Sequence, residues 1–559
     1  MKTFQSFLIV VCVSVLVVLN TNAQAKTSAE NWATTGLKFE AFQQVLSEDQ
    51  GCYSEQKIFV ACVQSINSLL ASLNPPLELR ADDRPVQNIA MGQKIFGPLF
   101  VTEKTPIKFI KDEPFFMRRE REKKERARIQ AALEAAYLLK NKVSFSELLT
   151  WTYDEVIAPR PPYQSALLRE SELVGKAFNT YFSIRFDPHT IFMPKEAFND
   201  MRSDISVSLA GIGAIIKLMN GKFSVSNLAE NGPAHHAGLY AKDIITHLDG
   251  VSVEGLSFGQ MLSQVRGPIG SRVELTVLRK NKISKITITR GLVVEKNIES
   301  KMLSRGNKRY AYIQLRSFME KKGCDKVESA LKELLAQGAQ GVVLDLRNNT
   351  GGSLDQGVCL TSLFLGFGKK VLEVRSLTDK KNIETHYADR FKVTNLPMVT
   401  LINELSASSS EIVAGALQDH QRSIIVGTRS FGKGTVQSSG SLKAYENIVY
   451  LHTLAQFYLP SGRTNQIVGV MPDIALLPTP FLSGTDMVST REEDLYTNAL
   501  PPTGAPWVQP RPLAITKLKN CTKQNGTALA DYLKADEFDA LAPDFQVLYA
   551  QDVLNCLAR

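Results

Sequence analysis

The sequence predicts a multi-domain α/β protein whose core lies between two regions rich in helix. Two stretches, 310–346 and 399–426, carry this prediction, because in each an apolar strand precedes an amphipathic helix and a second apolar strand. Strand–helix–strand order is typical of an α/β sheet. The length of 559 residues is the third observation, since it exceeds the size of a single domain.

Residues 1–25 are predicted to be a secretory signal peptide. Lys2 precedes the apolar run Phe7–Leu19, and Ala23-Gln24-Ala25 has the small-residue pattern of a cleavage site. A retained membrane anchor is the alternative, but this run is too short to span a bilayer. We therefore expect an exported, periplasmic bacterial protein with no transmembrane segment in the mature chain.

Residues 26–205 are predicted to form a helical N-terminal region. Their most basic stretch, Arg118–Arg128, has no interleaved aromatic residues, so we expect a solvated helix face and no nucleic-acid partner. The overall composition, with 44% hydrophobic and 22% charged residues, is that of a globular protein. The net charge of +9 does not by itself identify a partner.

Cysteines beyond the predicted signal peptide are candidates for disulfide bonds, because an exported protein folds in an oxidising compartment. The expected pairs are Cys52–Cys62 and Cys521–Cys556, and Cys324–Cys359 is a further candidate. Buried free thiols are the alternative. No spacing of cysteine and histidine resembles a zinc site, so no metal is expected.

Residues 206–295 contain an ordered set of short glycine-rich turns and strands. Gly211-Ile212-Gly213-Ala214 opens the set, Asn231-Gly232-Pro233-Ala234 lies in the middle, and Val273–Leu278 alternates like a strand. This set resembles a PDZ domain. PDZ domains add a peptide C-terminus as a strand and hold its carboxylate on backbone N–H groups, here those of Gly211, Ile212, Gly213 and Ala214.

Residues 296–478 are predicted to be the α/β core. The strand Gly341–Leu346 is apolar on both faces, which is typical of a buried parallel strand, and it runs into the turn Arg347–Gly352. Residues 479–559 begin with a linker rich in Pro and Gly and continue into a helical region from Ile515.

A serine cluster at the start of a predicted helix is the candidate for chemistry. Ser408 lies where free backbone N–H groups favour a developing oxyanion. No G-x-S-x-G motif is present, and Lys433, between two glycines, is the candidate base. Burial disfavours the charged form of an amine, which allows serine–lysine chemistry. The alternatives are a capping box, Ser408–Glu411, and a phosphate-binding turn, although the P-loop spacing is missing.

The two halves together, SASSSEIVAGALQD and GTRSFGKGTVQ, strongly resemble the carboxyl-terminal processing, or tail-specific, peptidases. The resemblance implies that Ser408 is the nucleophile, Lys433 the base and Gln437 the residue that orients it. Asp419 matches a family aspartate and is a candidate supporting residue. Ser409 replaces the usual alanine after the nucleophile, which we expect to cause no loss because only its N–H is needed.

The motif L-R-x-N-x-G-G of the same family matches residues 346–352 and implies an oxyanion hole. Its donors would be the N–H groups of Ser409 and of Gly351 or Gly352. Glycine at these positions lets the backbone approach a substrate carbonyl closely. A plain structural turn is the alternative.

The resemblance implies a periplasmic serine endopeptidase that recognises apolar protein C-termini through its PDZ domain and works with no metal or other cofactor. Its partners would be protein substrates and an adaptor protein. A non-catalytic PDZ scaffold or chaperone on a peptidase fold is the alternative. A zinc peptidase is a further alternative, against which the absence of H-E-x-x-H counts.

Overall fold

The computed structural model describes 32, 35–49, 51–71, 77–81, 95–96, 99–103, 115–137, 145–153, 166–202, 208–219, 222–229, 232–254, 261, 264–265, 267, 269–279, 282–294, 296–442, 445–478, 491–496, 499–506, 508, 512–525 and 544–558. The predicted signal peptide lies outside these residues. The chain forms two compact units: Ser203–Gln437 with Leu454–Arg559, and Lys26–Arg202 with Ser438–Thr453. Among the described residues, no helix has the length and hydrophobicity needed to cross a bilayer.

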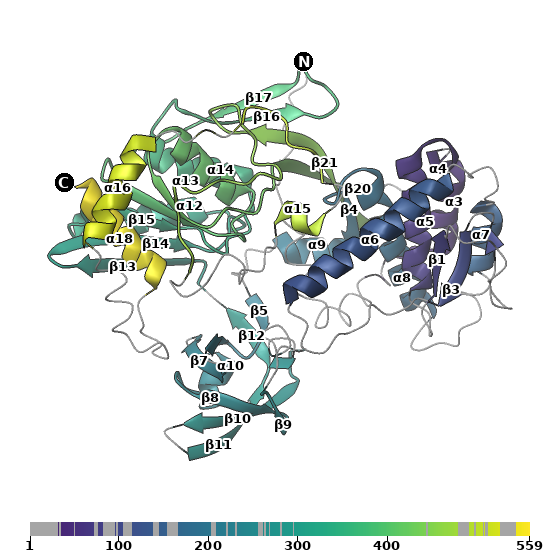
Figure 1. The fold of residues 1–559 in the computed structure, drawn as a ribbon, viewed down its shortest axis with the longest axis horizontal. Coiled ribbons are helices and arrows are strands. Elements are labelled where there is room, and N and C mark those ends of the chain that lie inside the picture. The colour runs from purple at the N-terminus through teal and green to yellow at the C-terminus, as the bar shows by residue number, and fades with distance from the viewer. Residues whose placement is uncertain are drawn as a thin grey trace. The chain divides into compact units, whose positions relative to one another are not determined.

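The unit that contains Lys26–Arg202 is mostly helical, with a small antiparallel sheet that the sequence did not predict (Figure 1). Its helices are α3 (Phe39–Glu48), α4 (Gly51–Ser54), α5 (Gln56–Leu70), α6 (Phe115–Tyr137), α7 (Phe145–Thr152), α8 (Ala166–Arg185) and α9 (Lys195–Arg202). The sheet has the order β1 (Leu77–Ala81), β3 (Leu99–Glu103), β2 (Ile95–Phe96). Buried side chains of α3, α5 and α8 form its core, and β4 (Ile191–Pro194) pairs with β21 (Tyr445–Tyr458).

The range predicted to be a PDZ domain folds into an antiparallel sheet around a small core that includes Val225, Leu239 and Leu275. The strand order is β11 (Lys282–Thr289), β10 (Arg272–Arg279), β8 (Ile244–Leu248), β7 (Lys222–Leu228), β6 (Ala214–Met219), with β9 (Val251–Ser252) on β8. The short helix α10 (Pro233–His236) follows β7, and β5 (Ser208–Gly211) pairs with β12 (Gly291–Val294).

The α/β core is built on a six-stranded sheet, which confirms the predicted fold class. Its order is β13 (Ile298–Arg305), β14 (Lys308–Leu315), β15 (Val342–Asp345), β18 (Met398–Ile402), β19 (Ile424–Gly427), β22 (Ile474–Ala475). Every neighbouring pair from β14 to β22 is parallel, and β13 is antiparallel to β14.

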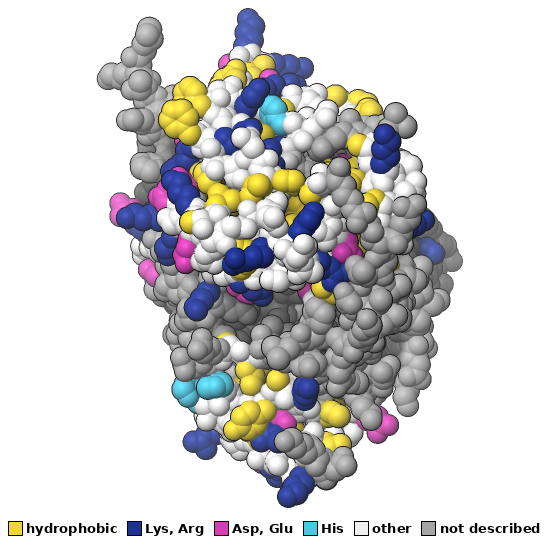
Figure 2. All heavy atoms as spheres, turned by 90° about the vertical axis from the view of Figure 1, so that its left-hand side faces the viewer, with side chains coloured by type: hydrophobic (Ala, Val, Ile, Leu, Met, Phe, Trp, Pro, Cys, Tyr) yellow, Lys and Arg dark blue, Asp and Glu magenta, His cyan; other side chains and the backbone are white. Residues whose placement is uncertain are grey.

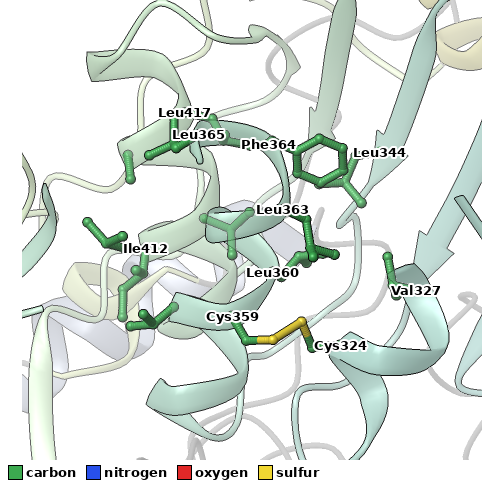
Figure 3. Packing of buried hydrophobic residues seen from close by; sticks show 14 of the residues in the cluster. Cys324, Val327, Leu344, Cys359, Leu360, Leu363, Phe364, Leu365, Ile412 and Leu417 are labelled. Carbon is green, nitrogen blue, oxygen red and sulfur yellow. A yellow bond between two sulfur atoms is a disulfide. The ribbon is translucent and has the colours of Figure 1, made fainter. Parts of the chain in front are cut away.

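Helices cover both faces of this sheet, so the central strands are apolar on both sides. Buried side chains of α12 (Gly323–Ala336), α13 (Leu354–Leu365) and α14 (Ser409–Asp419) pack on the face that includes Leu344 (Figure 3). The opposite face, which includes Val343, packs against α16 (Pro512–Asn525) and α18 (Phe545–Leu557). The C-terminal helices therefore complete the core.

A second sheet of the structure has the order β17 (Ile383–Tyr387), β16 (Lys370–Ser376), β21, β20 (Thr435–Leu442). The described residues after β22 include a short helix, α15 (Glu492–Leu495), and an otherwise irregular stretch up to residue 508. This stretch packs on the loop after β19, since Glu492 N donates to Phe431 O at 3.0 Å.

The described cysteines form disulfide bonds between neighbouring helices. Cys52 is bonded to Cys62 between α4 and α5, and Cys521 to Cys556 between α16 and α18. Cys324 is bonded to Cys359, which joins α12 to α13 inside the core (Figure 3).

Candidate active site

Three loops meet at the carboxyl ends of the neighbouring parallel strands β15, β18 and β19. Because parallel strands end at the same edge of a sheet, this edge gathers side chains from distant parts of the chain. Two backbone bonds tie the loops together: Ala407 N donates to Asn349 O at 3.0 Å, and Phe431 N donates to Ser406 O at 3.0 Å. The edge thus holds the serine cluster, the glycine turn at 351–352 and the loop that leads to Lys433.

Ser408 lies at the turn between β18 and α14 with a strained backbone. Its φ of 54° and ψ of −112° fall in a backbone region that residues other than glycine rarely adopt. Such a conformation costs about 1–3 kcal/mol and is concentrated at functional sites. The side chain is buried, with an exposed fraction of 0%.

The hydroxyl groups of the serine cluster differ sharply in their hydrogen bonds. Ser406 Oγ donates to Leu346 O at 2.8 Å, and Ser410 Oγ donates to Asn349 O at 2.7 Å. Ser409 Oγ lies 3.1 Å from the carbonyl oxygens of both Gly352 and Ser353. Ser408 Oγ has no hydrogen-bond partner among the described residues. Its hydroxyl is therefore the one in the cluster that serves no backbone contact.

Lys433 lies just before β20, and its side chain is held by a glutamine of that strand. Lys433 Nζ donates to Gln437 Oε1 at 2.5 Å, and Gln437 Nε2 donates to Thr435 Oγ1 at 2.9 Å. The three residues are spaced by two, so an extended backbone directs them to one side. Lys433 and Gln437 are each 1% exposed. No hydrogen bond joins Lys433 Nζ to Ser408 Oγ in this structure.

Glu411 connects the serine turn to the lysine loop. Its Oε2 accepts the backbone N–H groups of Ser408 at 2.8 Å and Lys433 at 2.9 Å. Its Oε1 accepts Ser430 Oγ at 2.6 Å and Gly432 N at 2.8 Å. Burial raises the pKa of Glu411 to about 7, and these four hydrogen bonds oppose the rise.

The same residue shows how much of the predicted capping box forms. Glu411 does accept the N–H of Ser408, as a capping box requires. The Ser408 side chain faces the N–H of Glu411 as in a capping box but forms no hydrogen bond there, and that N–H donates to the main-chain oxygen of Ser408 at 2.8 Å. Capping therefore leaves the hydroxyl of Ser408 available.

The glycine turn passes directly beside the serine. A Cβ atom on Gly351 would lie 2.9 Å from Ser408 Cβ, and Gly351 and Gly352 have φ of 100° and 145°. Only glycine fits here. The N–H of Gly351 donates to Asn349 Oδ1 at 2.9 Å, whereas the structure gives the N–H of Gly352 no partner among the described residues.

Asp419 lies at the opposite end of α14 from Ser408. It accepts Arg463 Nη2 at 2.9 Å and the N–H of Ser461 at 3.0 Å. Burial lowers the pKa of Arg463, and Asp419 offsets part of this effect. The structure does not bring Asp419 together with the serine and lysine, so its contacts support the helix end rather than the reacting groups.

The predicted peptide-binding loop, Gly211–Ala214, joins β5 to β6. Gly213 has a φ of 72°, and the carbonyl of Ile212 accepts the N–H of Ala234 at 2.7 Å. The sequence also predicts an amphipathic segment that ends at Val265, and most of it lies outside the described residues. Met261 and Val265 are buried in the core of this sheet.

Sequence reasoning assigned Glu411 only a capping role and did not identify Thr435. The signal for Thr435 was present, because positions 433, 435 and 437 alternate along a strand. No local sequence pattern predicted that Glu411 would accept hydrogen bonds from the lysine loop. The described residues contain no group of three or more His, Cys, Asp or Glu side chains arranged to hold a metal ion.

The comparisons with known proteins agree with this arrangement. The model of peptidase family S41 matches residues 309–476, and that of the PDZ domain matches residues 210–289. A carboxy-terminal-processing protease of Bartonella bacilliformis is 35% identical over 314 residues, which are 55% of this chain and 70% of that protein. A probable CtpA-like serine protease of Staphylococcus haemolyticus is 29% identical over 297 residues, 53% of this chain and 58% of that protein.

Among solved structures, the photosystem II D1 C-terminal processing protease matches 62% of this chain and 90% of its own, with 26% identity and a TM-score of 0.38. The family assignment does not depend on this likeness. It rests on the family models and on the Bartonella relative, which the chain covers for more than two thirds of its length. The chain belongs to peptidase family S41, as a carboxy-terminal processing serine protease homologue with a PDZ domain.

Proposed function

We propose that this chain is a periplasmic, tail-specific serine endopeptidase in which Ser408 attacks a peptide carbonyl and Lys433 acts as the base. The observation that carries the proposal is the free hydroxyl of Ser408 beside three serine hydroxyls bound to backbone carbonyls. A strained backbone at the same residue supports it, since such strain is retained where the surrounding structure enforces it.

In this mechanism the neutral amine of Lys433 removes the proton of Ser408 Oγ as the acyl-enzyme forms. The protonated amine then gives the proton to the leaving nitrogen. Gln437 Oε1 holds the amine in place. Ser408 Oγ and Lys433 Nζ are buried and are not hydrogen-bonded to each other in this structure, so the two groups must approach each other before the proton is transferred.

The oxyanion donors we propose are the N–H groups of Ser409 and Gly352. Ser409 is the first residue of α14, where N–H groups have no partner within the helix. The N–H of Gly351 is the weaker candidate, because it already donates to Asn349. Donors fixed in this way commonly contribute about 10²–10³-fold to the rate.

Substrate selection is assigned to the loop Gly211–Ala214, whose backbone N–H groups would hold the carboxylate of a substrate C-terminus. An apolar final residue would enter the adjacent hydrophobic core region. The substrates are proteins with apolar C-termini, and an adaptor protein would deliver some of them. No cofactor takes part in this mechanism.

The test compares cleavage of an unfolded protein with an apolar C-terminus by the wild type, Ser408→Ala and the matched control Ser410→Ala. We expect a loss of about 10³-fold or more for Ser408→Ala. Ser410→Ala, which loses only a bond to Asn349, should stay within about tenfold of the wild type. A chelator should have no effect.

Two results would count against the proposal. Cleavage by Ser408→Ala at the wild-type rate would remove Ser408 as the nucleophile. Binding of C-terminal peptides by a wild type that cleaves nothing would favour the PDZ scaffold instead.

A further inference from the structure

We propose that the turns Gly366–Lys369 and Ala388–Lys392 form a docking surface for an anionic lipid bilayer. Three of the large hydrophobic side chains exposed on the described residues lie in or directly beside these turns, namely Phe367, Tyr387 and Phe391. The others are spread over the rest of the described chain, two of them at the opposite end of the β16–β17 hairpin. Figure 2 shows hydrophobic side chains intermingled with Lys and Arg over the upper part of one face of the molecule.

The two turns lie side by side and are fixed to each other by their backbones. Gly368 N donates to Ala388 O at 2.8 Å, and Ala388 N donates to Lys369 O at 2.7 Å. A Cβ atom on Gly366 would lie 3.1 Å from Lys392 Cβ. The surface is therefore a rigid part of the core unit.

Each turn presents one phenylalanine to solvent. Phe367 is 72% exposed and Phe391 is 87% exposed, and their ring centroids are 6.5 Å apart. Removing a phenylalanine side chain from water is favourable, and both rings forgo this gain while they are exposed. Because the two exposed rings lie together, they form a contiguous apolar surface, which indicates an interaction site.

The charges around the two rings identify the chemistry of the partner. Lys369 and Lys392 are exposed, and neither forms an ion pair with any described residue. Arg390 is paired with Asp325 and Glu328 of α12. Asp389 is the one acidic residue of the two turns, so the unpaired charges beside the rings leave a net positive charge.

This combination fits a lipid surface better than a protein. Lysine is depleted at protein–protein interfaces, whereas interfacial membrane anchors combine aromatic tips with basic residues. The rings would enter the headgroup boundary, and the ammonium groups would lie among anionic headgroups. Each lysine near such a surface contributes about fivefold to binding.

The experiment measures co-sedimentation of the exported full chain with vesicles of phosphatidylcholine alone and of phosphatidylcholine with phosphatidylglycerol. All variants share the same N-terminus, so any contribution of residues 1–25 to vesicle binding is the same in each protein. The test variants are Phe367→Ser/Phe391→Ser and Lys369→Glu/Lys392→Glu. The matched controls are Val251→Ser, at 67% exposure, and Lys321→Glu, which is also exposed.

We expect the wild type to bind the anionic vesicles at least about tenfold better than the neutral ones and to lose this preference in high salt. Both double variants should lose about tenfold or more, and both controls should bind like the wild type. In Phe391→Trp, the emission of the new indole should shift to the blue on anionic vesicles.

Three results would overturn the proposal. These are equal binding to both kinds of vesicle, double variants that bind like the wild type, and an unshifted Phe391→Trp emission. If Phe367→Ser/Phe391→Ser instead dissociates an oligomer in sedimentation velocity without vesicles, the surface is a contact between copies of the chain.

Discussion

Lys433 Nζ donates a hydrogen bond of 2.5 Å to Gln437 Oε1, and both side chains are almost fully buried. A neutral amide oxygen orients an amine without adding a charge beside it. A carboxylate at the same place would favour the ammonium form, which cannot act as a base. A glutamine at this position therefore suits the proposed role of Lys433 as a base.

Replacing Gln437 should show whether this residue positions the amine of Lys433 or contributes to substrate binding. In Gln437→Ala the amine loses its acceptor, so we expect kcat to fall about 10–100-fold with little change in KM. Gln437→Glu should move the rise of rate with pH to higher pH, because the carboxylate stabilises the ammonium. These values come from initial rates over a range of pH. A Gln437→Ala variant with the kcat of the wild type would show that Gln437 does not position the base.

Glu411 should make the stability of the core depend on pH. Its pKa is raised from 4.5 to about 7, so the folded state binds this proton more tightly than the unfolded state. The stabilisation is complete below pH 4.5 and is lost as the pH rises through 7. The loss amounts to at most about 3 kcal/mol.

Glu411→Gln should remove this dependence, since glutamine does not titrate. Denaturant unfolding at a series of pH values from about 4 to about 8 gives the free energy of unfolding of the wild type and of the variant. The two pH profiles are then compared. Parallel pH profiles for the two proteins would mean that Glu411 titrates alike in the folded and unfolded states.

The state of the substrate tail should control the rate of cleavage. A C-terminal carboxamide removes the charge that the N–H groups of Gly211–Ala214 would hold, and a charged final residue would not suit an apolar site. We expect each change to slow cleavage about tenfold or more. A substrate acetylated at its N-terminus is the control. If free-acid and amidated tails are cleaved equally, capture by the PDZ domain is not part of substrate selection.

Local patterns in the sequence were sufficient to predict the α/β fold and the family, and the structure and comparisons confirm both. The patterns are local because a buried parallel strand is a continuous apolar run and a helix start carries its own signals. The roles of Ser408, Lys433 and Gln437 stay predictions, although the structure brings them to one edge of the sheet.

Features that depend on contacts between distant residues could not be predicted. The sequence of α16 and α18 shows two helices but not that they cover the second face of the core sheet. Likewise, two hydrogen bonds follow from how three loops meet. The N–H of Lys433 donates to Glu411, and the N–H of Gly351 donates to Asn349. The small sheet of β1, β2 and β3 lay in a region whose pattern favoured helix.

The central claim, that Lys433 is the base, is tested most directly by Lys433→Arg. Arginine keeps the positive charge and nearly the length of lysine, but its guanidinium stays protonated in proteins. It could serve a structural or phosphate-binding turn and could not act as a base. Lys433→Ala gives the reference for complete loss.

His420→Ala is the control for a histidine mechanism, because His420 lies at the C-terminal end of α14 with Nε2 2.7 Å from Lys370 O. The measurement is kcat/KM over a range of pH for the wild type and the three variants. We predict that Lys433→Arg is as inactive as Lys433→Ala, about 10³-fold or more below the wild type, and that His420→Ala keeps the rise of rate with pH. Substantial peptidase activity in Lys433→Arg would contradict the serine–lysine mechanism.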